Sequence, residues 1–122
     1  MSKSIYRDLE VWQKSRALAS RVYQLTLSFP RSEMFGLTSQ MRRASISVIS
    51  NIAEGHGRKS IDDTIRFLVI ARGSLLEIEA QTVVAIDLEY LESDTGEGLI
   101  AQTLEAVRLL NGLIRHYERK RP

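Results

Sequence analysis

The chain has 122 residues, of which 43% are apolar and 26% charged, which suffices for one hydrophobic core but not for two. It contains no cysteine, which excludes disulfides, thiolate nucleophiles and cysteine-ligated zinc or iron–sulfur centres. The net charge of +2 is uneven, because residues 1–60 are basic and residues 61–122 are acidic, so a polyanion would meet mainly the first half.

The N-terminal segment MSKSIYRDLEVW is charged and lacks the apolar run of a signal peptide. No run of about 18 apolar residues occurs, so no membrane span is predicted. We therefore expect a cytoplasmic protein with no membrane partner. The chain has only 2 prolines and 7 glycines for turns, which favours a few long helices.

The first predicted element is an amphipathic helix over residues 8–28, which Pro30 ends. Asp8 offers an N-cap or a first-turn acid for this helix. The apolar positions recur at steps of three and four residues, apart from one gap filled by a serine: Val11, Leu18, Val22, Leu25 and Phe29.

The second predicted element is a helix over residues 32–56, whose apolar residues keep the helical spacing for about five turns. Residues 46–52 are rich in β-branched side chains, so a strand is the alternative there, but no partner strand of matching alternation follows. We expect Gly55 and Gly57 to end the helix, because glycine tolerates the left-handed conformation.

A third helix is predicted over residues 61–91, with Ser60 as its N-cap and an acid three residues later. Residues 92–96 are expected to form a loop, and apolar spacing predicts a fourth helix over residues 98–119. Short connections make neighbouring helices antiparallel. The prediction is one all-α domain, residues 1–122, folded as an up-and-down antiparallel four-helix bundle.

The first two helices carry apolar strips wider than a single neighbour requires, which favours assembly of several copies into a homo-oligomer. Four aromatic residues either cap the core or belong to a self-association surface: Tyr6, Trp12, Tyr23 and Phe35.

No set of residues indicates an ordinary enzyme. His56 and His116 lie far apart in the sequence, and neither has a His or Glu at the spacing of helical metal ligands. Glu77 and Glu79 point to different helix faces, and the serines within residues 45–50 lack an adjacent base. We expect no catalytic residue, no metal site and no cofactor.

Basic residues suggest a polyanion as partner. Arg7, Lys14 and Arg21 are spaced to form one stripe along the first helix. Further positive charge lies in or near the second helix and in the C-terminal tail, at Arg42, Arg58, Lys59, Arg115, Arg119, Lys120 and Arg121. An ordinary solvated helix face is the alternative. No recognition helix or aromatic RNA-binding motif accompanies the charge, so RNA or DNA would be bound through backbone and shape.

Three segments resemble the four-helix-bundle family of proteins encoded in intervening sequences of bacterial 23S rRNA genes: LEVWQKS (9–15), GLTSQMRRASISVISNIAEGHGR (36–58) and FLVIARGSLLEIEAQ (67–81). The resemblance implies a cytosolic bundle that assembles into a ring-like homopentamer, with a proposed role in binding nucleic acid. A related branch is the accessory protein of diversity-generating retroelements, which binds nucleic acid and a reverse transcriptase.

The family motif corresponds to two groups of residues in this chain: Arg42, Arg43, Asn51, Glu54, Gly55 and Arg58, and Gly73, Ser74, Leu75, Glu77 and Glu79. Many members have a proline where this chain has Ile49, so no proline kink is expected in the second helix.

A polar seam along the second helix includes Arg43 and Glu54, which are about three helical turns apart and too distant to touch. Each then needs partners on another helix, and Glu77 or Glu79 is the expected complement of Arg42 or Arg43. We interpret the seam as a mainly structural polar network that fixes helix register: Arg43, Asn51, Glu54, Glu77 and Glu79.

Two functions stay open at this point. The first is a non-enzymatic oligomer that binds RNA or DNA through its basic surface. The second is a protein-binding scaffold or accessory subunit for a reverse transcriptase or a ribosomal partner, in which the basic residues only solvate the surface. A hydrolase or metalloprotein has the least support.

Overall fold

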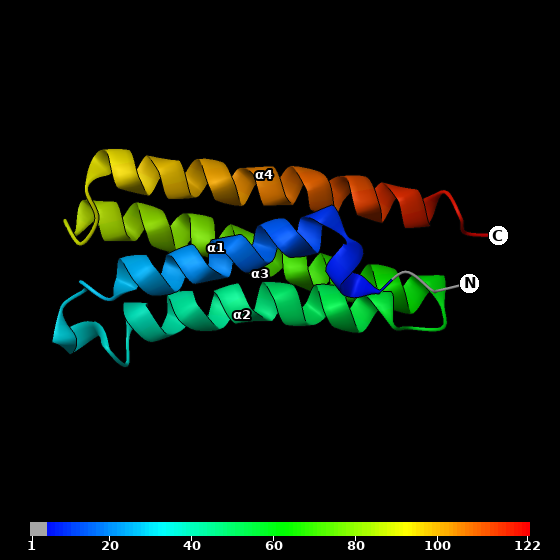
Figure 1. Cartoon of the computed structure of the whole chain (residues 1–122), viewed down its shortest axis with the longest axis horizontal. Helices are drawn as coiled ribbons and strands as arrows, with labels where there is room; N and C mark the ends of the chain where they lie inside the picture. The colour runs from blue at the N-terminus through cyan, green and yellow to red at the C-terminus, as the bar shows by residue number, and fades with distance from the viewer. Residues whose placement is uncertain (1–4) are drawn as a thin grey trace.

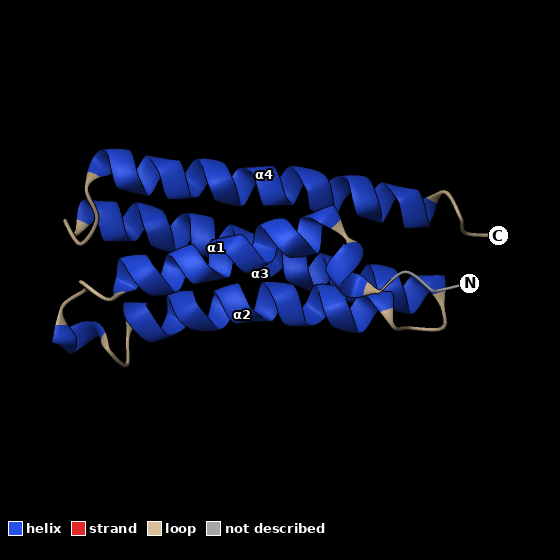
Figure 2. Cartoon of the chain, in the orientation of Figure 1, coloured by secondary structure: helices blue, strands red, loops and turns tan. Residues whose placement is uncertain are grey.

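The computed structural model describes residues 5–122, which form helices and connections with no β-strand. The α-helices are α1, Glu10–Thr26; α2, Leu37–His56; α3, Ile61–Asp87; and α4, Ser93–Glu118. Two short 3-10 helices, η1 (Tyr6–Asp8) and η2 (Arg31–Glu33), precede α1 and α2. The four α-helices lie side by side along the long axis, and the C-terminus and the α2–α3 turn are at the same end (Figures 1 and 2).

Each α-helix packs against two others, because α1 and α3 both contact α2 and α4. One hydrophobic core fills the space between them, and every α-helix contributes fully buried side chains such as Leu18, Met41, Leu75 and Leu110. Burial of each such side chain contributes about 1.5–3 kcal/mol. The predicted all-helical fold with four α-helices is confirmed, and the alternative strand at 46–52 is excluded, because that segment lies inside α2.

The first two predicted helices, 8–28 and 32–56, begin differently from the prediction. Each is preceded by a 3-10 helix, and Leu9 between η1 and α1 has an extended backbone. Asp8 therefore belongs to η1 and not to the start of α1. Its carboxylate accepts a hydrogen bond of 3.2 Å from the backbone N–H of Ile5.

The predicted loop over residues 92–96 is wrong, because α4 begins at Ser93. The predicted third helix reaches residue 91, but α3 ends at Asp87. The chain reverses at residues 88–92 instead, where Glu89 has a left-handed φ of 63°. Gly96 is buried, and a Cβ at this position would overlap the side chain of Ile86 on α3. This glycine allows α3 and α4 to approach closely and does not break a helix.

Gly55 plays the same part between α2 and α3. The expected left-handed helix end does not occur, because Gly57 has a right-handed φ of −87° and Gly55 lies within α2. A Cβ on Gly55 would lie 3.0 Å from Phe67 Cβ and 3.2 Å from the carbonyl oxygen of Thr64. The Thr64 hydroxyl also donates a 2.8 Å hydrogen bond to the Gly55 carbonyl oxygen, so the two helices are joined at this point.

Two smaller predictions are confirmed. Ser60 caps α3, since its hydroxyl oxygen accepts a hydrogen bond of 3.1 Å from the backbone N–H of Asp63. α2 is one unbroken helix through Ile49, whose carbonyl oxygen accepts a 3.2 Å hydrogen bond from Trp12 Nε1. Tyr6 contacts the Trp12 ring edge to face at 5.0 Å, so this aromatic pair covers the core beside α1.

Gly55→Ala is expected to lower the free energy of unfolding by about 1–3 kcal/mol, because the added methyl group forces α2 and α3 apart. Gly112→Ala in α4 is the matched control: its Cβ would lie 3.9 Å from Arg115 Nη2, an ordinary contact. Alanine raises helix propensity there by about 1 kcal/mol. Denaturant unfolding measures both variants, and equal stabilities would contradict the close approach at Gly55.

Candidate nucleic-acid interface and self-association face

The α2–α3 turn presents Arg58 and Lys59 to solvent. Arg58 lies over the ring of Phe67, with its guanidinium carbon 4.5 Å from the ring centroid, and Arg66 lies over the same ring at 4.7 Å. A guanidinium stacked on an aromatic ring is held in place while its N–H groups stay free to bond an anion. Two guanidinium groups are therefore held at one aromatic ring beside this turn.

Each of these arginines also has an acidic neighbour. Arg58 pairs with Glu54 at 2.8 Å and Arg66 with Asp63 at 3.3 Å, and all four side chains are substantially exposed. Exposed pairs of this kind contribute less than about 1 kcal/mol, so a phosphate group can compete for the arginines.

The C-terminal tail reaches the same end of the molecule. Arg121 Nε lies 2.9 Å from Asp62 Oδ1, which attaches the tail to the first turn of α3. The positive charge that the sequence places in the C-terminal tail and the basic turn thus lie on one surface. We call it the basic end, and its members are Arg58, Lys59, Arg66, Arg119, Lys120 and Arg121.

Two members of the predicted α1 stripe face α4. Arg21 is half-buried and donates a 3.3 Å hydrogen bond to Gln102 Oε1. Near Lys14 lies Glu105, whose pKa is lowered mainly by a hydrogen bond from Arg108, while desolvation opposes this effect and the charges of Arg108 and then Lys14 add smaller contributions that lower it. Arg21 is therefore held by a neutral amide of α4, and the acid near Lys14 is already paired with Arg108.

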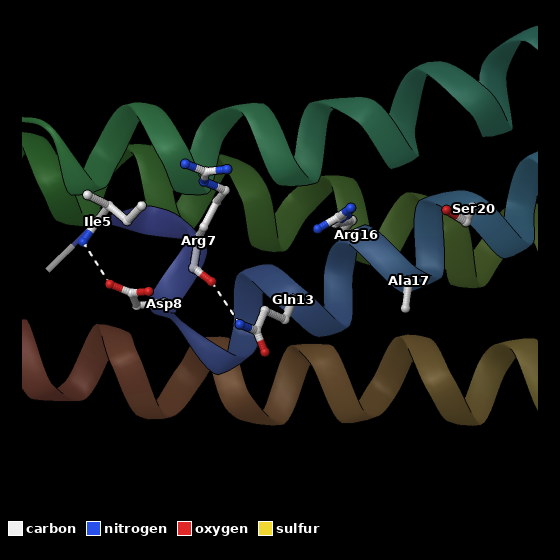
Figure 3. Close-up of a pocket in the computed structure, with 7 residues that line it drawn as sticks. All are labelled: Ile5, Arg7, Asp8, Gln13, Arg16, Ala17 and Ser20. Atoms are coloured by element: carbon white, nitrogen blue, oxygen red, sulfur yellow. Dashed lines mark hydrogen bonds between the residues drawn. The ribbon is translucent and has the colours of Figure 1, made fainter.

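Arg7 lies in η1, so it does not continue the stripe on α1. Its carbonyl oxygen accepts a 2.9 Å hydrogen bond from Gln13 Nε2, and in Figure 3 its side chain extends away from α4. A shallow surface hollow adjoins it, lined by Ile5, Arg7, Asp8, Gln13, Arg16, Ala17 and Ser20. The structure therefore separates Arg7 from Lys14 and Arg21, which stay together on the side of α1 that faces α4.

Arg42 fastens α2 to α1. Its Nε donates a 2.9 Å hydrogen bond to Thr26 Oγ1, its Nη2 donates a 3.4 Å bond to the Tyr23 carbonyl oxygen, and its guanidinium lies over the Tyr23 ring at 4.8 Å. This side chain is half-buried and already engaged, which suits a structural role better than contact with a phosphate.

The polar network between α2 and α3 is centred on serine and asparagine. Ser47 and Ser74 share a 2.9 Å hydrogen bond between their hydroxyl groups. Asn51 Nδ2 donates to the Ser47 carbonyl oxygen at 2.8 Å and to the Ser47 hydroxyl oxygen at 3.0 Å. Asn51 is therefore the member of the expected polar network that takes part in these hydrogen bonds.

The expected pairing of Arg42 or Arg43 with Glu77 or Glu79 is not present among residues 5–122, whose ion pairs involve other residues. Arg43 and Glu77 are exposed and line a groove between α2 and α3. Glu79 is half-buried, and the exposed Glu54 pairs with Arg58 on its own helix. In a single chain, the charged side chains of Arg43, Glu54 and Glu77 are exposed to solvent, so they do not form a buried network that fixes the register of the helices.

An exposed apolar face on α3 escaped the sequence analysis. We call it the α3 outer face; it consists of Val69, Gly73, Leu76, Ala80 and Val83. The three large side chains are each 40–47% exposed. The steps of four and three residues between its members were visible in the sequence. The sequence did not reveal which of these apolar positions are exposed, because the core-facing side of α3 is apolar as well.

Within residues 5–122, no group of three or more His, Asp or Glu side chains is arranged to hold a metal ion. In the same part of the chain, no helix combines the length and the hydropathy needed to cross a membrane.

Among residues 5–122, these features define a four-helix bundle with shallow surface hollows, a basic end and an exposed apolar face on α3. The chain belongs to the family described as 23S rRNA-intervening sequence protein, which it matches over residues 7–112. It is also similar to a crystal structure from Bacteroides thetaiotaomicron, described as a protein of unknown function from the S23 ribosomal protein family. The two share 27% identity and superpose with a TM-score of 0.77, covering 85% of this chain and 97% of the other. No curated protein matches the chain.

The adjacent residues Arg42 and Arg43 are expected to respond differently to substitution. Arg42→Ala should lower the free energy of unfolding by about 1–2 kcal/mol, because it removes two hydrogen bonds and a stacked ring contact. Arg43→Ala should change it by less than about 0.5 kcal/mol, because the side chain is exposed. Denaturant unfolding compares the two, and a larger loss for Arg43→Ala would restore the buried network that the sequence predicted.

Proposed function

We propose that the protein is a non-enzymatic module that assembles into a ring-like homo-oligomer through the α3 outer face and binds RNA or DNA through its basic ends. The resemblance to the family gives five copies as the expected number. The observation that carries the proposal is the position of the two surfaces, because the basic α2–α3 turn leads directly into the helix that bears the apolar face.

The α3 outer face has the geometry of a helix-packing seam. Its members alternate steps of four and three residues over about four turns, which keeps them on one side of a helix that packs against another. Gly73 and Ala80 are small enough for a neighbouring backbone to come close. A continuous apolar face of this kind, exposed on a single chain, marks an interaction surface.

Cyclic assembly would multiply the charge of the basic end. Rotation about a ring axis places equivalent ends of every copy on the same side, so the arginines and lysines of all copies would face one ligand. Phosphate contacts add to one another and weaken with salt, so several weak sites give useful affinity. The basic end has no base-reading motif, which favours recognition of backbone and shape.

A non-enzymatic role is supported by the residue types. The hydroxyl groups of Ser47 and Ser74 bond to each other, and Ser47 also accepts hydrogen bonds from the Asn51 amide. Among residues 5–122, neither hydroxyl is bonded to a histidine or a carboxylate that could activate it as a nucleophile. The site of action we propose is the cytoplasm.

The alternative function is a protein-binding scaffold or accessory subunit, with a reverse transcriptase or a ribosomal component as partner. It is supported by apolar surface that the α3 outer face does not account for. A complex that survives nuclease treatment and high salt would favour it.

Leu76→Glu combined with Val83→Glu is expected to reduce the mass of the assembly to that of single chains, because two charges would be buried in each contact. Leu104→Glu is the matched control, since Leu104 is exposed to a similar extent on α4. Light scattering after size exclusion measures the masses. Loss of assembly in the control alone would place the contact on α4.

Arg58→Gln combined with Lys59→Gln is expected to weaken binding of labelled RNA and DNA at least tenfold and to reduce the salt dependence by about two phosphate contacts per chain. The comparison protein carries Arg7→Glu, Lys14→Glu and Arg21→Glu and should bind better than the turn variant. Fluorescence anisotropy over a salt series measures both. Full binding by the turn variant and none by the α1 variant would return the interface to α1.

A further inference from the structure

The end of the bundle opposite the basic end exposes large apolar side chains. They belong to the connection between α1 and α2, where Leu27 is 77%, Met34 49% and Phe35 92% exposed. Leu88, in the α3–α4 turn at this same end, is half exposed. Side chains this large are rarely left in water without a role when several of them gather at one place.

The connection is held firmly, so looseness does not account for the exposure. Phe29 is buried and packs against the Tyr90 ring at 5.4 Å. Glu33 accepts hydrogen bonds from the Leu37 backbone N–H at 3.0 Å and from the Tyr90 hydroxyl at 2.8 Å, and these two bonds lower the pKa of Glu33. Met34 and Phe35 therefore stand next to a fixed anchor that also joins the two connections at this end.

This end is strongly acidic. Residues 24–36 and 84–98 contain one basic residue, Arg31, and six acids: Glu33, Asp87, Glu89, Glu92, Asp94 and Glu97. Two further arginines reach these segments, because Arg42 bonds to Thr26 and Arg21 lies against Gly98, and the acids still outnumber the arginines by six to three. Asp87 lies in the last turn of α3, where a negative charge opposes the helix dipole at a cost of about 0.3–1 kcal/mol. Glu89 holds a left-handed backbone conformation that side chains other than glycine seldom adopt. Two of these acids thus occupy positions that local stability disfavours.

We propose that this acidic and apolar end docks a basic polypeptide segment, with a large apolar side chain of the partner covering Phe35. Charge complementarity selects the partner. Nucleic acid and anionic lipid surfaces are repelled by the acidic rim, whereas lysine and arginine side chains are attracted to it. The apolar residues supply the buried centre and the acids the polar rim that specific protein contacts require. The proposal does not rest on nucleic-acid binding or on the ring.

The test is selection from a displayed library of random peptides of about twelve residues, long enough to span such a surface. The wild-type protein is compared with Met34→Ser/Phe35→Ser and with Asp87→Lys/Glu92→Lys. Peptides enriched on the wild type should carry a net positive charge and a large apolar residue. Their dissociation constants should rise at least tenfold, which corresponds to about 1.4 kcal/mol, on either variant. Leu104→Ser, which replaces an apolar residue on α4 about as exposed as Met34, should leave them unchanged.

Unfolding curves and scattering mass are recorded for every variant. The exposed serine substitutions should leave both unchanged, since these side chains contribute little to the core. No enrichment over the variants, enrichment of neutral or acidic peptides, or equal affinity for the Met34→Ser/Phe35→Ser protein would overturn the proposal. A fall in mass for that protein would also overturn it, because this end would then be a contact between copies.

Discussion

The close contact between α2 and α3 at Gly55 determines how the rest of the molecule is arranged. No side chain separates the two backbones there, so the Thr64 hydroxyl reaches the Gly55 carbonyl oxygen. The same alignment brings Ser47 and Ser74 within hydrogen-bonding distance further along the helices. These two contacts also fix the rotation of α3 about its own axis, because they hold the helix to α2 near its start and at its middle. The same side of α3 therefore always faces the core, and the opposite side faces solvent.

Periodicity in the sequence was sufficient to place the four helices, but glycine was misread as a signal for their ends. Gly96 and Gly55 both lie inside helices and are there because another helix approaches them. A sequence cannot distinguish these two uses of glycine, since both need the missing side chain. In the structure the chain reverses at Glu89 instead, a residue type that does not favour turns.

The candidate sites depended on information that only the packing supplies. The basic stripe assumed one continuous helix through Arg7, and the extended backbone at Leu9 breaks that continuity. Arg42 and Arg43 are adjacent residues of the same type, yet Arg42 is hydrogen-bonded to α1 and Arg43 is exposed to solvent. α3 is apolar on two sides, which resembles a helix buried all round until its neighbours are known. The spacing of apolar residues therefore predicted where α3 lies in the sequence, but not which of its apolar sides is exposed to solvent.

The unequal ends of the bundle have a kinetic consequence. Positive charge gathers beside the α2–α3 turn, and negative charge gathers about the length of α3 away, so the molecule carries an electric dipole along its axis. A dipolar body near a charged surface turns before it touches, and this turning reduces the range of orientations that must be searched at encounter. Every copy would approach a polyanion with the same end leading. Salt would slow this alignment even where it left the final contacts unchanged.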